Sequence, residues 1–176
     1  MKSLAAHIAR PDVPAEIALT LTNRPDAGGI EFCREQGLAC AVLDHKAYDS
    51  REAFEAEMQR QLEQAGVELI CAAGFMRLLT AGFVQKWKNR ILNIHPSLLP
   101  AHKGLHTHER ALAAGDSEHG CTVHVMTAAM DDGEIIVQKK VPVLADDTPD
   151  VLAARVLEQE HLAYPEALDK VLKNLS

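Results

Sequence analysis

The sequence predicts an α/β protein with a mostly parallel, twisted sheet that is flanked by helices and has an antiparallel C-terminal portion. Short apolar runs alternate with amphipathic segments along the chain, the order expected of strands joined by crossover helices. Residues 67–73 form a nearly continuous apolar run bounded by glycines, which is typical of a strand buried on both faces. Aromatic residues make up only 4% of the chain, so Leu, Val, Ile and Ala must build the core.

The first half of the chain is predicted to alternate helices and short strands. Apolar residues at helical spacing predict a first helix that Pro11 and Pro14 end, and Gly37 and Gly66 are placed to cap two later helices at their C-terminal ends. The predicted helices cover residues 1–9, 27–36 and 49–65, and the predicted strands cover residues 16–22, 39–43 and 67–73.

The second half is predicted to continue this alternation and then to change. After a helix at 80–87, a strand at 91–94 leads into a loop at 95–100, which two prolines make rigid. A helix, two β segments that are expected to pair antiparallel, and a long closing helix follow. Their predicted ranges are 106–114, 121–127, 135–143 and 149–172.

One feature departs from the usual order of such folds. The chain opens directly on a helix, whereas a doubly wound domain normally opens on a central strand whose exit turn binds phosphate. We therefore expect the first strand to be absent from the sequence and the neighbouring strands to be left with unpaired N–H and C=O groups. Residues 1–176 are otherwise expected to form a single domain, since no linker or internal repeat divides them.

Composition and charge exclude several classes of protein. No run approaches the ~18 apolar residues of a membrane span, and no secretory signal is present, so a cytoplasmic protein without membrane contact is expected. A net charge of −7 disfavours nucleic-acid binding. The four cysteines have no CxxC spacing and are expected to be reduced thiols.

Asn93, His95 and Asp131 are the candidate catalytic residues. The first two lie two residues apart at the end of a predicted strand, so their side chains point the same way, where open α/β sheets bind ligands. An amide can donate to a developing oxyanion, an imidazole can carry a proton, and a carboxylate can orient the imidazole. The set suits acyl transfer to an amine without a covalent nucleophile. A purely structural Asn-x-His is the competing interpretation, and the rigid loop argues against it.

Other sites were weighed against this one. Six histidines raise the idea of a metal site, but His106 and His108 do not share a helix face and no HExxH is present, so no metal is expected. Ser97 lacks the context of a nucleophile elbow. Four basic side chains are candidates for a phosphate-binding patch or are simply solvated charges. The histidines are His95, His102, His106, His108, His119 and His124, and the basic side chains are Arg51, Arg77, His102 and Lys103.

Five stretches together resemble the glycinamide ribonucleotide transformylases. They are Ala-Gly-Phe-Met-Arg at 73–77, Asn-Ile-His-Pro-Ser-Leu-Leu-Pro at 93–100, Lys-Gly-Leu-His-Thr-His at 103–108, Asp131, and Gln-Glu-His at 159–161. The similarity extends over essentially the whole chain. It implies a Rossmann-like formyltransferase fold, with transfer of the formyl group from 10-formyltetrahydrofolate to the amine of glycinamide ribonucleotide in purine biosynthesis. In that family an Asn, a His and an Asp form the catalytic set, which matches Asn93, His95 and Asp131.

The resemblance also implies roles for other residues. Folate binding is implied for Met76, Arg77, Leu78 and Leu79 on one wall and for Thr127 and Ala128 on the other. Substrate binding is implied for Arg51, Gly74 and Glu160, although Arg51 and Glu160 also suit a helix surface. Small molecules are the expected partners, with a monomeric or homodimeric protein.

The sequence differs from the family pattern at two places. A Gly-x-Gly-Ser-Asn turn that grips the substrate phosphate is not found, so the chain is expected to be truncated at its N-terminus relative to the family. Asp132 stands where a glycine is frequent. An inactive folate-binding remnant is therefore one alternative function. Others are a formyltetrahydrofolate deformylase, which differs around the His-Pro-Ser segment, and another formyltransferase such as the methionyl-tRNA enzyme, which has a further domain.

Overall fold

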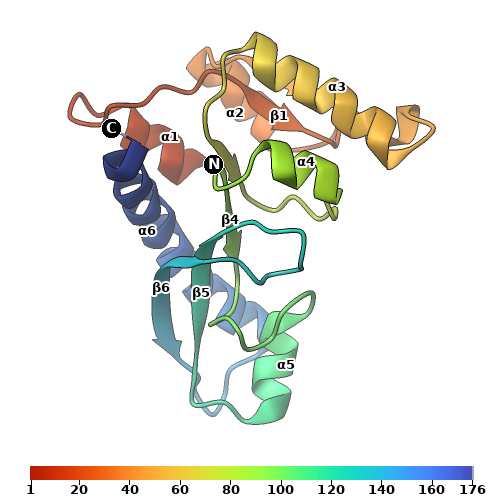
Figure 1. Ribbon diagram of the computed structural model, residues 1–176. Helices are drawn as coiled ribbons and strands as arrows, with labels where there is room; N and C mark the ends of the chain where they lie inside the picture. The colour runs from red at the N-terminus through yellow and green to blue at the C-terminus, as the bar shows by residue number, and fades with distance from the viewer. Residues whose placement is uncertain (176) are drawn as a thin grey trace.

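The computed structural model describes residues 1–175 and has the predicted alternation of helices and strands (Figure 1). The helices are α1 (Lys2–Ile8), α2 (Gly29–Gln36), α3 (Arg51–Gln64), α4 (Ala81–Lys86), α5 (Thr107–Ala114) and α6 (Pro149–Leu175), with a 3₁₀ turn, η1 (His45–Ala47). The strands are β1 (Thr20–Thr22), β2 (Cys40–Val42), β3 (Ile70–Ala72), β4 (Ile91–His95), β5 (Glu118–Val125) and β6 (Ile135–Pro142).

The helix ends follow from local chemistry. The side chains of Ser50 and Thr80 accept hydrogen bonds from the backbone N–H groups three residues later, which begins α3 and α4. Gly37 and Gly115 take φ angles of 65° and 71° after α2 and α5, a conformation that favours glycine at a helix C-terminus. The predicted elements therefore exist, and their ends are the parts that shift.

The described strands form two separate sheets. β1 and β2 pair in parallel as one, and the order β3-β4-β5-β6 forms the other. In the larger sheet β3 and β4 are parallel, whereas β4 with β5 and β5 with β6 are antiparallel. This confirms the predicted α/β fold, including its antiparallel C-terminal portion.

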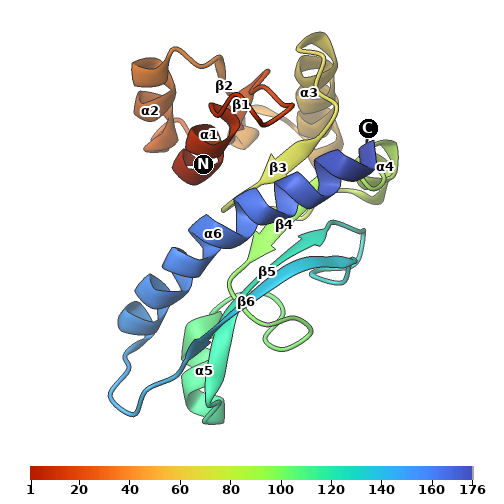
Figure 2. The ribbon, with the colours of Figure 1, turned by 90° about the vertical axis from the view of Figure 1, so that its left-hand side faces the viewer.

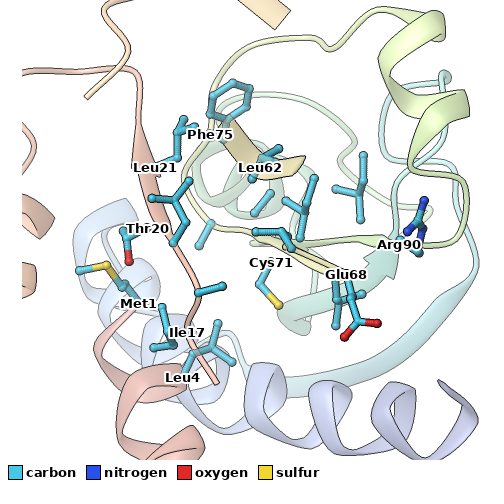
Figure 3. Close-up of a pocket in the computed structure, with 18 of the residues that line it drawn as sticks. Met1, Leu4, Ile17, Thr20, Leu21, Leu62, Glu68, Cys71, Phe75 and Arg90 are labelled. Atoms are coloured by element: carbon cyan, nitrogen blue, oxygen red, sulfur yellow. The ribbon is translucent and has the colours of Figure 1, made fainter. Parts of the chain in front are cut away.

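A cavity of about 920 Å³ lies between β1 and β3 (Figure 3). Two continuous stretches line it, residues 14–23 and 66–75, together with side chains of α1 and α6. The pairing registers turn the backbone groups of Thr20 and Thr22 toward β2 and those of Ile70 and Ala72 toward β4. The N–H and C=O groups of Leu21 and Cys71 therefore point to the gap. The gap therefore separates the two sheets along these two strand edges.

The core is divided into two clusters. The larger cluster joins α1, α5 and α6 to β4, β5 and β6, and includes Leu92 and Ile94. The smaller one joins α3 and α4 to Ile91, with Leu19 and Leu21 packed against it. Because Ile91 and Leu92 point to opposite faces of β4, the clusters cover opposite sides of that strand. In Figure 2, α6 runs across the larger sheet.

The loop after β4 is held by side chains of β5 and β6. The Ser97 hydroxyl donates to the carbonyl of Ala101 at 2.7 Å, and the Thr122 hydroxyl donates to the carbonyl of Ser97 at 2.6 Å. Thr122 also accepts from the N–H of Leu99, and Gln138 donates to the carbonyl of Leu99. The predicted rigid loop is thus fixed by hydrogen bonds as well as by its prolines.

The strands differ from prediction mainly in length. The ranges 16–22 and 67–73 shrink to three residues each, because only the residues at 20–22 and 70–72 pair with a neighbouring strand. By contrast, β5 begins at Glu118 instead of 121, since the polar residues at its start pair with β6. None of the described helices is long and apolar enough to cross a membrane.

Candidate functional site

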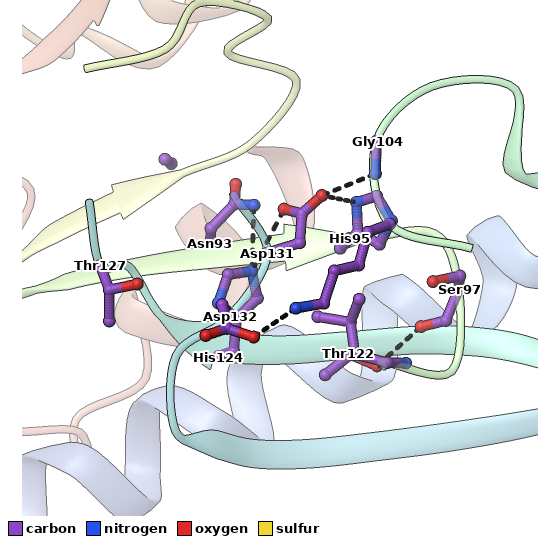
Figure 4. Close-up of polar contacts among 12 residues, drawn as sticks. Asn93, His95, Ser97, Gly104, Thr122, His124, Thr127, Asp131 and Asp132 are labelled. Atoms are coloured by element: carbon purple, nitrogen blue, oxygen red, sulfur yellow. Dashed lines mark hydrogen bonds and ion pairs between the residues drawn. The ribbon is translucent and has the colours of Figure 1, made fainter. Parts of the chain in front are cut away.

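The end of β4 brings Asn93 and His95 onto the face of the sheet that also carries Ile91. Leu92 and Ile94 point the other way, into the larger core cluster, and this fixes the direction of the two polar side chains. His95 is only 7% exposed. The expected common direction of the two side chains is visible in Figure 4, where both lie beside Asp131.

Both ring nitrogens of His95 face oxygen atoms. Nδ1 lies 3.5 Å from Oδ2 of Asp131, and Nε2 lies 3.0 Å from the backbone carbonyl of His102. A ring in this position can donate at both nitrogens once it takes up a proton. These two contacts fix the orientation of the ring at the end of β4.

Asp131 lies in the connection between β5 and β6 and has a φ angle of 49°, a left-handed conformation that is uncommon for a residue with a side chain. Its Oδ2 accepts a 2.9 Å hydrogen bond from the N–H of Gly104. Two residues later, a Cβ atom on Gly133 would lie 1.5 Å from the carbonyl oxygen of Val125. Only glycine fits there, so Gly133 allows the two ends of the turn that carries Asp131 to lie close together.

His124 is a site residue whose role the sequence did not indicate. Its Nδ1 donates to the carbonyl of Val125 at 3.0 Å, and this leaves Nε2 as an acceptor for the Asn93 amide at 3.4 Å. Burial lowers the pKa of His124, which keeps the ring neutral. Nε2 also lies 3.8 Å from Oδ1 of Asp131. The ring therefore fixes which end of the Asn93 amide donates, a pairing across strands that only the β4–β5 register reveals.

Several residues with implied binding roles meet in one small pocket. Arg51, Met76, Arg77 and Leu78 line a cavity of about 270 Å³. Met76 and Leu78 are 75% and 58% exposed, so both present apolar surface to solvent. Arg77 lies over the Phe54 ring at 5.9 Å. The pocket combines apolar surface with two guanidinium groups, a composition suited to an aromatic ligand that carries an anionic group.

The remaining predicted residues are more dispersed. Leu79 packs against the smaller core cluster, and Gly74, with a φ angle of 66°, begins the loop after β3. Thr127 and Ala128 are exposed in the turn that carries Asp131. Glu160 lies in α6, where burial raises its pKa while the Met1 amino group opposes that shift.

The other histidines form pairs instead of a metal centre. Nδ1 of His108 lies 3.1 Å from Nε2 of His119, and His102 lies 2.6 Å from Asp116. Burial, with His108 and His102 nearby, lowers the pKa of His119 to about 4. Among the described residues, no group of three His, Cys, Asp or Glu side chains is arranged to hold a metal ion.

Fold and site together define an α/β protein with a histidine–carboxylate pair at the carboxyl end of a sheet strand. The model of the formyl transferase family matches residues 1–168. Phosphoribosylglycinamide formyltransferase of Escherichia coli is 44% identical over 153 residues, which are 87% of this chain and 72% of the relative. The crystal structure of the enzyme of that name from Brucella melitensis has a TM-score of 0.93 at 46% identity and covers 97% of this chain and 88% of its own. The chain therefore belongs to the formyl transferase family, among the phosphoribosylglycinamide formyltransferases.

A second type of relative is much longer. The trifunctional purine biosynthetic protein adenosine-3 of Drosophila melanogaster is 47% identical over 156 residues, 89% of this chain. The chain spans 12% of the length of that protein. The family resemblance seen in the sequence is thus confirmed by relatives of two kinds, one similar in size and one containing a similar unit.

Proposed function

We propose that the chain transfers the formyl group of 10-formyltetrahydrofolate to the amine of glycinamide ribonucleotide in de novo purine biosynthesis. The observation that carries this proposal is the grouping of Asn93, His95 and Asp131 at the end of β4 in a member of the formyl transferase family. The similarity to a phosphoribosylglycinamide formyltransferase and to a purine biosynthetic protein supports the same reaction.

Each of the three side chains has a step to perform. When the amine adds to the formyl carbon, the carbonyl oxygen becomes negative, and the Asn93 amide with a protonated His95 ring stabilises it. Asp131 balances the charge of the ring through the 3.5 Å contact with Nδ1. The amine must lose a proton before the folate nitrogen leaves with one, and His95 and Asp131 are the groups placed to move it.

The folate would lie in the pocket of Arg51, Met76, Arg77 and Leu78. Its exposed apolar side chains fit a flat ring system, and the guanidinium groups fit a carboxylate. Thr127 and Ala128, which are exposed in the turn that carries Asp131, are the proposed opposite wall. Arg51, which borders this pocket, remains with Gly74 and Glu160 a proposed contact to the ribonucleotide.

Formyl transfer is tested by incubating the purified chain with both substrates and measuring the formylated product by mass spectrometry. His95→Ala is expected to lower kcat by about 10²–10⁴-fold, since proton transfer and oxyanion stabilisation are both lost. His7→Ala is the matched control, because His7 also pairs with a carboxylate, Asp169 at 2.8 Å, but belongs to α1. Turnover that survives His95→Ala contradicts the assignment.

A folate-binding protein without turnover is the second candidate. The observation that favours it is the cavity between β1 and β3, which leaves strand edges unpaired and interrupts the sheet that supports the site. We infer that relative to its family the chain lacks one central strand. Folate binding measured by calorimetry, together with no product in the assay above, would establish this alternative.

A further inference from the structure

Two loops border the pair of His95 and Asp131, and they touch through two adjacent contacts. The loop at residues 101–106 follows β4, and the turn at 126–134 joins β5 to β6. Lys103 forms an ion pair with Asp132, and the next residue, Gly104, donates its N–H to Asp131. Figure 4 shows the Asp131 and Asp132 carboxylates each engaged by the opposite loop.

The loop at 101–106 is well anchored. Arg110 of α5 donates to the carbonyls of Lys103 and Leu105, at 2.6 and 3.3 Å. The His102 ring contacts Asp116, and the backbone carbonyl of His102 accepts a hydrogen bond from Nε2 of His95. These contacts tie the loop to α5 and to the end of β4, so it is a fixed reference for the side chains around it.

The turn that carries Asp131 is held less firmly. Residues 127–130 are exposed, and within them the Thr127 hydroxyl donates to the carbonyl of Ala129. Asp131 itself has the left-handed φ angle of 49°. Of the contacts described for its carboxylate, the one at hydrogen-bond length comes from Gly104, whereas His95 and His124 lie at 3.5 and 3.8 Å. The position of this carboxylate therefore depends on the opposite loop.

We propose that the ion pair between Lys103 and Asp132 is a latch that positions Asp131 against His95. This inference rests on the formyl transfer proposed above, in which Asp131 acts through His95. Lys103 precedes Gly104 in the chain, and Asp132 follows Asp131. The ion pair between Lys103 and Asp132 therefore helps to keep the Gly104 N–H within hydrogen-bond distance of the Asp131 carboxylate.

The expected size of the effect follows from exposure. The side chains of Lys103 and Asp132 are 34% and 59% exposed. An exposed pair is weak, and losing it is expected to lower kcat by about two- to fivefold. Salt should weaken the latch as well, because exposed charges are screened. Lys103 and Asp132 are thus positioning residues that act through Asp131.

The test uses Asp132→Asn, Lys103→Met and the exchanged pair Lys103→Glu with Asp132→Lys. Lys140→Met is the matched control, because Lys140 forms a similarly exposed ion pair with Glu118 between β5 and β6, away from the turn. Three quantities are measured for each variant: kcat at saturating substrates, the melting temperature, and the exchange rate of the Gly104 amide by NMR.

Each single variant is expected to lower kcat by about two- to fivefold and to speed exchange at Gly104, with little change in melting temperature. The exchanged pair should restore both, and Lys140→Met should change neither. Unchanged Gly104 exchange in both single variants overturns the latch. So does loss of rate with Gly104 exchange unaffected and no rescue, because Lys103 would then act by contacting substrate. If the unaltered chain shows no turnover, formyl transfer fails, while Gly104 exchange still decides the latch.

Discussion

β4 in the larger sheet and β1 in the two-stranded sheet are both short strands with a parallel neighbour, but they differ strongly in burial. Four of the five residues of β4 are buried, whereas no residue of β1 is. β4 pairs on both edges and is covered on both faces, while β1 pairs on one edge and faces the cavity on the other. Sequence alone therefore does not decide how deeply a strand is buried, because each strand also needs its neighbours.

The difference matters for the candidate site. Asn93, His95 and His124 lie in β4 and β5, inside the continuous sheet, so their directions are fixed by pairing and by the core. Residues 14–23 and 66–75 line the gap instead, on the side of the sheet where α1 and Glu160 also lie. The residues around His95 are thus held by the larger sheet, whereas the residues on the other side border the cavity.

The largest expected contrast is between two leucines. Leu92→Ala should lower the free energy of unfolding by about 3–5 kcal/mol, because its side chain is fully buried in the larger core cluster. Leu21→Ala should cost only about 1 kcal/mol, since the side chain is partly buried beside existing open space. Chemical denaturation of both variants measures the difference. Equal costs would mean that the gap is closed in solution.

A smaller effect is expected from filling the gap. The variant carries an added segment Val-Ile-Val-Ile-Val, joined to Met1 by a short flexible linker. Because Met1 lines the cavity, the added segment can reach it. A strand that pairs with both free edges should stabilise the protein by about 2–4 kcal/mol, after the entropy of ordering is subtracted. Amide exchange at Leu21 and Cys71 should slow in parallel.

The control for this fusion carries proline at the central position of the added segment. Proline has no N–H and cannot pair with both edges, so most of the gain should disappear. An equal gain in stability with proline would show that the segment binds through apolar contact alone. Unpaired strand edges would then not explain why the two sheets differ.

The smallest effect concerns acid. The pKa of the buried His119 is lowered to about 4, so between pH 6.5 and 4 the unfolded chain binds a proton that the folded chain does not. Stability must fall as the pH drops through that window, by on the order of 2 kcal/mol once the pH has reached about 5. Because His119 belongs to β5, acid should destabilise the larger sheet and so reduce the difference in stability between the two sheets. Denaturation at several pH values should show a flatter profile for His119→Gln than for His106→Gln.

The order and type of the main elements could be predicted from the sequence because periodicity and turn residues report them locally. The 3₁₀ turn at His45–Ala47 was not predicted, and it depends on a cap by Asp44. Asn93, His95 and Asp131 could be predicted as neighbours because open α/β sheets bind ligands at strand ends, and the structure places the three side chains together. His124 and the contact of Lys103 with Asp132 were missed, since both depend on pairs 29 to 31 residues apart in the chain.

The four cysteines divide evenly between the two parts of the molecule. Cys33 and Cys40 belong to α2 and β2, and Cys71 and Cys121 belong to β3 and β5. Burial raises the pKa of Cys71 to about 11 and that of Cys121 to about 12, so few of these thiols ionise near neutral pH. Cys121 is fully buried, so an alkylating reagent reaches it only when the larger sheet opens, and the fully buried Cys33 reports in the same way on the other part. Labelling kinetics followed by peptide mass would report separately how often each half of the protein opens.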